Sequence, residues 1–171
     1  KEHPDVDPRF LFVNLGYNLR PMETQGAMGL NQLTKLDNKN KNRVINHDKI
    51  LNKLINDERN NDIFSSPKKQ LNSEPAWFSL TIILGEKYEE DYKSYLEYLT
   101  ESGVENRPVV TGNFIRQPVF KYLNMDIKPE SFKGAEILHK RGFFIGLSCE
   151  IIDDSKVYAL IEIFYNYNFN T

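Results

Sequence analysis

A helical pattern of hydrophobic residues comes first along this chain, and short β-type segments follow it. Apolar residues recur at three- and four-residue steps from Leu30 to Leu54, which is typical of one helix face. Pro21 suits a first helical turn, so we expect a helix over residues 21–55. Such a helix would be about 50 Å long, whereas a compact domain of this chain length is about 40 Å across. We therefore expect it to pack against another domain or subunit.

Asparagines interrupt this helical pattern. Asn38, Asn40, Asn42 and Asn46 fall within the predicted helix, and asparagine is a poor helix former. They predict a bend or break in this part of the helix. The next stretch, residues 58–75, is rich in Asn, Ser and Pro and is predicted to be a loop.

The remainder of the chain alternates strand-like and helix-like segments. Strands are predicted at 76–84, 104–110 and 143–147, and helices at 86–101, 130–141 and from Asp153 onward, with Gly103 as a C-cap and an irregular segment at 112–124. This order predicts an α/β (α+β) fold in which helices cover one face of a small three-stranded sheet.

Composition limits the classes of function. The 171 residues suffice for one domain, or one domain with an arm, and 40% hydrophobic content is ordinary for a globular protein. A net charge of −2 argues against a nucleic-acid binder, which would carry a basic stripe. No apolar run approaches the roughly 18 residues that span a bilayer, and no signal peptide is visible. The single Cys149 excludes an internal disulfide. We expect a cytoplasmic protein without nucleic-acid or membrane partners.

Two polar residues stand just ahead of the long predicted helix. Asn18 and Arg20 precede a helix N-terminus, where unpaired N–H groups and the helix dipole favour an anion. A carboxamide and a guanidinium at such a place suit a phosphate. Gly26 and Gly29 keep the early turns thin, so that another backbone could approach. The alternative is an ordinary capped helix entry, with Arg20 paired to an acid such as Glu23, and spacing alone leaves both open.

Three runs resemble one enzyme family, in the family's order. GYNLRPMETQGAMGLNQLTKL (16–36) is similar to a segment of the DegT-type, vitamin-B6-dependent nucleotide-sugar aminotransferases and 3-dehydratases. VENRPVVTGNFIRQP (104–118) and GFFIG (142–146) resemble two later segments. The GN and RQP of the second run favour the lipopolysaccharide 3-dehydratase branch.

The resemblance implies a place for this chain within a roughly twofold longer enzyme. Residues 1–20 would be an arm and active-site loop, 21–57 a long inter-domain helix, and 58–171 the small C-terminal α/β domain of a fold-type-I transferase that uses pyridoxal 5′-phosphate (PLP). Such an enzyme would be a homodimer with a shared active site.

The resemblance also implies residue roles. Asn18 would bind the phosphate of PLP or pyridoxamine 5′-phosphate (PMP) held by the neighbouring subunit, with Arg20 beside it. One such hydrogen bond is worth about 1.5–3 kcal/mol. Arg107, Asn113 and Arg116 would contact the nucleotide-linked ketosugar at the mouth of the active site, although Arg107 could instead be an exposed residue at a strand end.

The implied activity is transamination or 3-deoxygenation of a nucleotide-linked 4-ketohexose for a surface polysaccharide such as lipopolysaccharide. In the family an upstream Lys marks the aminotransferases and a His the 3-dehydratases. Neither stands at a matching position here, so we expect no catalytic residue in this chain and no turnover by it alone. A non-catalytic dimerisation or ligand-sensing α+β module is the alternative, and it predicts a covered surface around residues 26–36.

Overall fold

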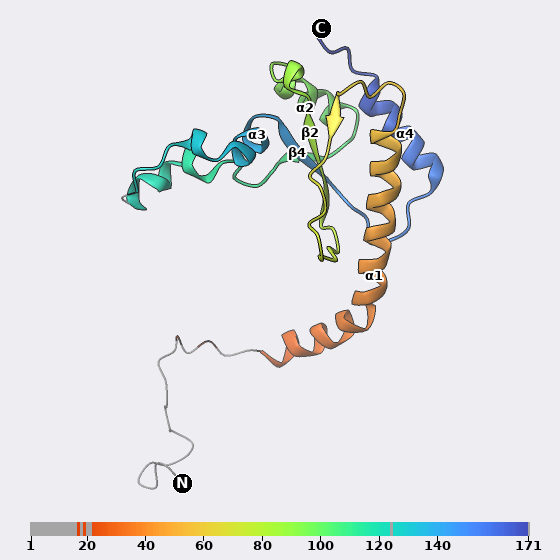
Figure 1. Cartoon of the computed structure of the whole chain (residues 1–171). Coiled ribbons are helices and arrows are strands. Elements are labelled where there is room, and N and C mark those ends of the chain that lie inside the picture. The colour runs from red at the N-terminus through yellow and green to blue at the C-terminus, as the bar shows by residue number, and fades with distance from the viewer. Residues whose placement is uncertain (1–16, 18, 20–21, 124, 171) are drawn as a thin grey trace. The chain divides into compact units, whose positions relative to one another are not determined.

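The computed structural model describes residues 17, 19, 22–123 and 125–170 (Figure 1). Contacts divide the chain into two units, residues 1–36 and 37–171, and each is described by itself. Helix α1, Glu23–Ile55, begins in the first unit and ends in the second. Within the described residues, no helix combines the length and the apolar character needed to cross a membrane.

The first unit is helical from Glu23 onward and leaves its side chains exposed. Leu30, Leu33 and Leu36 are 69%, 63% and 46% exposed. At the helix start, the backbone N–H of Met22 donates to Gln25 Oε1 at 3.1 Å. A glutamine at the third helical position supplies one of the two bonds of a capping box in this way, and Met22 offers no side-chain oxygen for the other.

An antiparallel sheet of four strands forms the centre of the second unit. In spatial order the strands are β1 (Phe64–Ser65), β2 (Ser79–Leu84), β4 (Gly142–Gly146) and β3 (Asn106–Pro108). The prediction of three strands was therefore one short. Strand β1 lies in the segment 58–75 that was expected to be a loop, and it forms because Phe64 is buried opposite Leu84.

Three further α-helices accompany the sheet. They are α2 (Tyr92–Glu101), α3 (Lys133–Arg141) and α4 (Asp154–Tyr165). Helices α2 and α3 are shorter than predicted, since each is preceded by a separate 3₁₀ turn, Glu86–Tyr88 and Pro129–Ser131. Asp91, at the N-cap of α2, makes no side-chain cap bond to the helix; its buried carboxylate accepts two hydrogen bonds from Asn170 instead. Gly103 ends α2 with φ +81°, which confirms its role as C-cap.

One face of the sheet carries the hydrophobic core. Leu80, Ile82 and Leu84 of β2 are fully buried, whereas the alternate residues of β2 are only half-buried. The core side chains that pack with this face are Ile50 and Leu54 of α1, Tyr95 and Leu99 of α2, and Val157, Ile161 and Phe164 of α4. These three helices therefore cover the same face, as predicted. The opposite face of the sheet, which carries Thr81 and Phe144, lies outside this core.

Helix α1 continues without interruption through its asparagines. The sequence predicted a bend or a break there, and the prediction of a break was wrong. Asn46 is fully buried, and its Nδ2 donates to the carbonyl oxygens of Ser148 at 3.0 Å and Glu150 at 2.7 Å. Its Oδ1 accepts from the N–H of Ile152 at 3.0 Å. Asn42 likewise donates to Cys149 O. These side chains outweigh their low helix propensity by binding the segment between β4 and α4.

Two aromatic residues join this part of α1 to the segment that leads into β2. The ring of His47 stacks on that of Trp77, with centroids 4.1 Å apart and planes 9° apart. His47 Nδ1 lies 2.9 Å from Asp48 Oδ1. Trp77 is half-buried and packs against the core.

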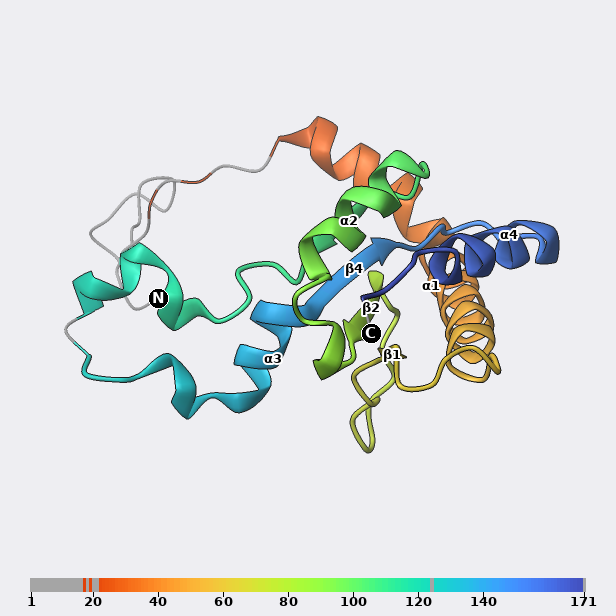
Figure 2. The ribbon, with the colours of Figure 1, turned by 90° about the horizontal axis from the view of Figure 1, so that it is seen from above.

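A long connection joins β3 to α3, and we call residues 110–132 the arm. The arm extends away from the sheet, in green to teal in Figures 1 and 2. Its described part consists of turns and 3₁₀ helices, Phe114–Arg116, Pro118–Leu123 and Pro129–Ser131, and contributes nothing to the hydrophobic core. Its exposed apolar side chains are Val110, Phe114, Val119, Tyr122, Leu123, Met125 and Phe132.

Candidate functional site

The predicted phosphate-binding residues Asn18 and Arg20 lie outside the described residues. Helix α1, which follows them in the sequence, has Glu23 in its first turn. The assignment of Asn18 and Arg20 to a phosphate therefore stays a prediction from the sequence.

Arg107 lies on the sheet face opposite the hydrophobic core. It is the cross-strand partner of Phe144, which in turn pairs with Thr81, and residues directly opposite one another share a face. Arg107 donates from Nη2 to Glu105 Oε1 at 2.7 Å, but the two side chains are 67% and 78% exposed. Such a surface pair is worth about 0–1 kcal/mol. The guanidinium can therefore exchange this partner for an anion at little cost.

Two aromatic rings extend this surface. Phe78, just before β2, lies with its ring centroid 5.9 Å from that of Phe144 and is 74% exposed. We call Phe78, Thr81, Arg107 and Phe144 the open face. The open face combines a guanidinium that can easily exchange its carboxylate partner with an exposed aromatic ring. This combination suits a ligand that has both a ring and a phosphate.

Asn113 is 1% exposed, and its whole carboxamide is engaged within the chain. Its Oδ1 accepts from the N–H of Ile115 at 3.3 Å and caps the first 3₁₀ turn of the arm. Its Nδ2 donates to Pro129 O at 3.0 Å and to Glu136 Oε2 at 2.8 Å. Both ends of the arm are thus joined through one side chain.

Arg116 shares the same acid. Its Nε donates to Glu136 Oε1 at 2.9 Å and to Oε2 at 3.0 Å, and its Nη2 also bonds this carboxylate. The guanidinium of Arg116, and then the amide of Asn113, lower the pKa of Glu136 to about 2. The pair with Glu136 correspondingly raises the pKa of Arg116. We call Asn113, Arg116 and Glu136 the latch. Two of the three predicted substrate residues are joined here, whereas the described contacts of Arg107 do not include the latch.

Backbone geometry explains the glycine beside the latch. Gly112 has φ +60°, and a Cβ at this position would lie 2.5 Å from Nδ1 of His139 and 2.9 Å from its Cα. Only glycine fits this close approach between arm and α3. The presence of glycine at 112 and of asparagine at 113 is therefore explained by contacts within this chain.

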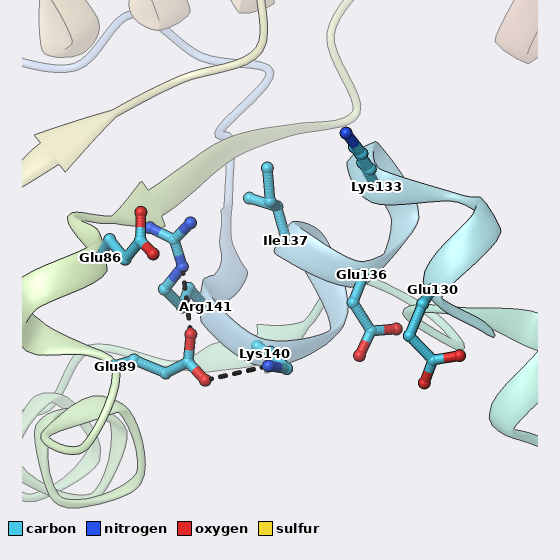
Figure 3. Close-up of a pocket in the computed structure, with 8 residues that line it drawn as sticks. All are labelled: Glu86, Glu89, Glu130, Lys133, Glu136, Ile137, Lys140 and Arg141. Carbon is cyan, nitrogen blue, oxygen red and sulfur yellow. Dashed lines mark ion pairs between the residues drawn. The ribbon is translucent and has the colours of Figure 1, made fainter.

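A cavity of about 310 Å³ adjoins the latch (Figure 3). It is lined by Glu86, Glu89, Glu130, Lys133, Glu136, Ile137, Lys140 and Arg141. Glu89 pairs with Lys140 at 3.3 Å and with Arg141 at 3.6 Å. The remaining charged residues of the lining are three carboxylates and one cation: Glu86, Glu130, Glu136 and Lys133. This cavity is poorly suited to a diphosphate.

Sequence reasoning missed Glu136. It stands 20 residues from Arg116 and 23 from Asn113, and neither spacing marks a local motif. Its position on α3, facing back to the arm, could be found only from the fold.

Comparisons with known proteins show which family this chain belongs to. The model of the DegT/DnrJ/EryC1/StrS aminotransferase family matches residues 3–162. The chain belongs to this family. The resemblance drawn from the three sequence runs is thereby confirmed.

Two curated relatives are 3-dehydratases. The chain is 34% identical over 147 residues to the GDP-4-keto-6-deoxy-D-mannose 3-dehydratase of Escherichia coli O55:H7, a match of 85% of this chain and 36% of that protein. It is 36% identical over 145 residues to the enzyme of the same name from Yersinia pseudotuberculosis, covering 82% of this chain and 35% of the relative. The chain thus spans little more than a third of the length of these relatives.

Solved structures confirm the fold. The E. coli GDP-4-keto-6-deoxy-D-mannose-3-dehydratase with bound hydrated PLP matches with a TM-score of 0.75 and 32% identity, over 91% of this chain and 38% of that one. DesV of S. venezuelae matches with a TM-score of 0.71 at 18% identity, over 92% of this chain and 39% of that one, and supports the fold alone. The chain therefore has the mixed helix and antiparallel-sheet fold of part of a fold-type-I PLP enzyme, as predicted.

Proposed function

We propose that this chain is the C-terminal part of a PLP- or PMP-dependent enzyme that acts on a nucleotide-linked 4-keto-6-deoxyhexose, for a surface polysaccharide such as lipopolysaccharide. The observation that carries the proposal is the 34% identity to the E. coli 3-dehydratase over 85% of this chain. The structural match to the PLP-bound E. coli enzyme supports the cofactor. A 3-dehydratase is favoured over an aminotransferase because both curated relatives above carry that name.

The residues of this chain fit the phosphate of the cofactor by their chemistry. Asn18 would donate an amide N–H, and Arg20 would offer a guanidinium fork, just ahead of α1. When bound, the cofactor supplies an electron sink for bond cleavage next to the sugar carbonyl. The role of Asn18 and Arg20 is to hold and orient its phosphate, from the partner subunit in a homodimer.

The open face is our proposed contact for the nucleotide-linked ketosugar. Arg107 gives up only an exposed pair with Glu105 when it binds a phosphate. Asn113 would have to break the latch before it could touch substrate, and Arg116 is already paired with Glu136. We therefore assign Arg107 to direct contact, and Asn113 and Arg116 to holding the arm in position.

The first unit supports an inter-domain role for α1. Leu30, Leu33 and Leu36 form an apolar stripe that remains largely exposed, and among the described residues nothing beyond the adjacent helix backbone would lie within 4 Å of a Cβ at Gly26 or Gly29. A self-contained sensing module would cover such a stripe within its own chain. We propose that residues 1–20 form an N-terminal arm and active-site loop, distinct from the arm at 110–132. Residues 21–57 would form an inter-domain helix and residues 58–171 a small domain, in a cytoplasmic homodimer.

The test uses the whole polypeptide that contains these residues, supplied with PLP, an amino donor and GDP-4-keto-6-deoxy-D-mannose. We expect mass spectrometry to show loss of the 3-hydroxyl. Replacement of the keto oxygen by an amine would indicate the aminotransferase branch instead. An unchanged substrate together with no cofactor binding would refute the proposal.

A variant pair tests the cofactor site. Loss of one hydrogen bond to a charged acceptor costs about 1.5–3 kcal/mol, so Asn18→Ala should weaken PMP binding roughly 10- to 150-fold. Asn31→Ala, at an exposed position of α1, is the control and should bind as the parent does. Equal affinities of the two variants would contradict the role of Asn18.

A further inference from the structure

Strand β4 has a glycine at each end, and the surroundings of the two glycines differ. A Cβ at Gly142 would lie 2.7 Å from the carbonyl oxygen of Leu138 and 2.9 Å from its Cα, so the close approach of α3 requires glycine there. A Cβ at Gly146 would meet nothing within 4 Å among the described residues beyond its chain neighbours. The described glycines with positive φ are Gly103 and Gly112, so the backbone does not require glycine at 146 either.

Glycine at position 146 is unfavourable for the strand itself. Strand β4 is an inner strand that pairs with both β2 and β3, and Gly146 is the cross-strand partner of Ser79. Glycine in a strand is less stable than alanine, because its backbone loses more conformational freedom on folding. In strands it often marks a place where a ligand or another backbone approaches closely. Contacts within the described chain do not explain Gly146, so we looked for such an approach.

Gly146 extends the open face. Residues two apart in a strand share a face, so Gly146 lies on the same side as Phe144, and it is exposed. Its partner Ser79 directly follows Phe78, whose ring centroid lies 5.9 Å from that of Phe144. The sheet surface is therefore bare of side chain at 146, next to two aromatic rings.

Arg107 lies near this bare position. It pairs with Phe144 from the neighbouring strand β3, and Gly146 is two residues, or about 7 Å, farther along β4. A phosphate at Arg107 and a ring at Gly146 would therefore be separated by a short span. In a nucleotide the ribose bridges such a span between phosphate and base.

We infer that the base of the nucleotide-linked substrate lies against Gly146, with its flat face on the ring of Phe78, while Arg107 holds a phosphate. This inference rests on the proposed function and names the part of the substrate that the open face holds. Every base has a π-face that stacks on an aromatic side chain. A second backbone could also lie on a bare glycine, but it has no use for the exposed Phe78 ring together with a guanidinium whose partner exchanges easily.

The test measures GDP binding by isothermal titration calorimetry, with the whole polypeptide that contains these residues. Gly146→Val fills the bare position and should weaken GDP binding roughly 5- to 150-fold, the range for the loss of one base stack. Phe78→Ala removes the ring and should fall in the same range. Gly134→Val is the control for added side-chain volume, because a Cβ at 134 also meets nothing within 4 Å, and it should bind GDP as the parent does.

Urea unfolding and PMP binding separate a substrate contact from a structural role. We expect Gly146→Val to be at least as stable as the parent and to bind PMP equally well. A loss of stability or of PMP affinity overturns the inference, because the polypeptide itself would then use this position. Unchanged GDP affinity in either Gly146→Val or Phe78→Ala overturns it too, as does a parent that binds no GDP. A parent that binds GDP as expected but does not convert the ketosugar refutes the proposed function alone.

Discussion

Asn46 offers the sharpest test of how α1 is joined to the rest of its unit. The substitution Asn46→Ala removes three hydrogen bonds, to Ser148 O, Glu150 O and the N–H of Ile152. At a net 0.5–1.5 kcal/mol each, their loss costs about 1.5–4.5 kcal/mol. Alanine returns about 0.5 kcal/mol through its higher helix propensity. The expected net loss is about 2.5 kcal/mol, or about 5–10 °C in Tm for a chain of this length.

Thermal and urea unfolding followed by circular dichroism measures this loss. Asn38→Ala is the matched control, because Asn38 lies exposed on the same helix and makes no hydrogen bond among those of the described side chains. It should be neutral, or more stable by about 0.5 kcal/mol, from propensity alone. If Asn46→Ala unfolds within about 0.5 kcal/mol of Asn38→Ala, a typical error of such comparisons, then the three bonds do not hold this segment and the reasoning fails.

Three further predictions concern the arm and the acid limit of stability. Gly112→Ala should destabilise by at least about 1–2 kcal/mol from its positive φ alone, before the clash with the neighbouring imidazole; Gly134→Ala, where nothing lies within 4 Å, should be neutral or stabilising in the same unfolding assay. Glu136→Gln removes the charge partner from the latch, so hydrogen exchange across residues 113–131 should accelerate, whereas Glu130→Gln should leave it nearly unchanged; equal rates in the two variants would refute the latch. The pKa values of Asp57 and Glu136 are lowered to about 2 by their arginine partners, from 3.8 and 4.5. Because the folded pKa is the lower one, their stabilisation is present above about pH 4.5 and is lost as the pH falls toward 2, which acid titration of the unfolding free energy would show.

Local patterns were enough to predict most of the regular elements, although not strand β1. A strand was predicted at residues 76–84 from its β-branched and aromatic content, and β2 forms within that range at Ser79–Leu84. Gly103 was identifiable as a C-cap because its effect depends only on its own backbone. The family, too, could be predicted, since its motifs are runs of adjacent residues.

Features that depend on distant partners could not be predicted. Asn46 resembles a helix breaker until its contacts near residue 150 are known. Glu136 gains its role only from residues 20 and 23 positions away. Strand β1 is two residues long, too short for any periodicity, and it exists because Phe64 packs against the core. In each case tertiary contacts override the local preference.

The stacked pair of His47 and Trp77 gives this protein an optical reporter of its own. Trp77 is the single tryptophan of the chain, so all indole fluorescence comes from one place. That indole lies face to face with a ring on α1, 4.1 Å away. Any event that separates this helix turn from the segment leading into β2 will change the emission. Such events can therefore be followed in unlabelled protein.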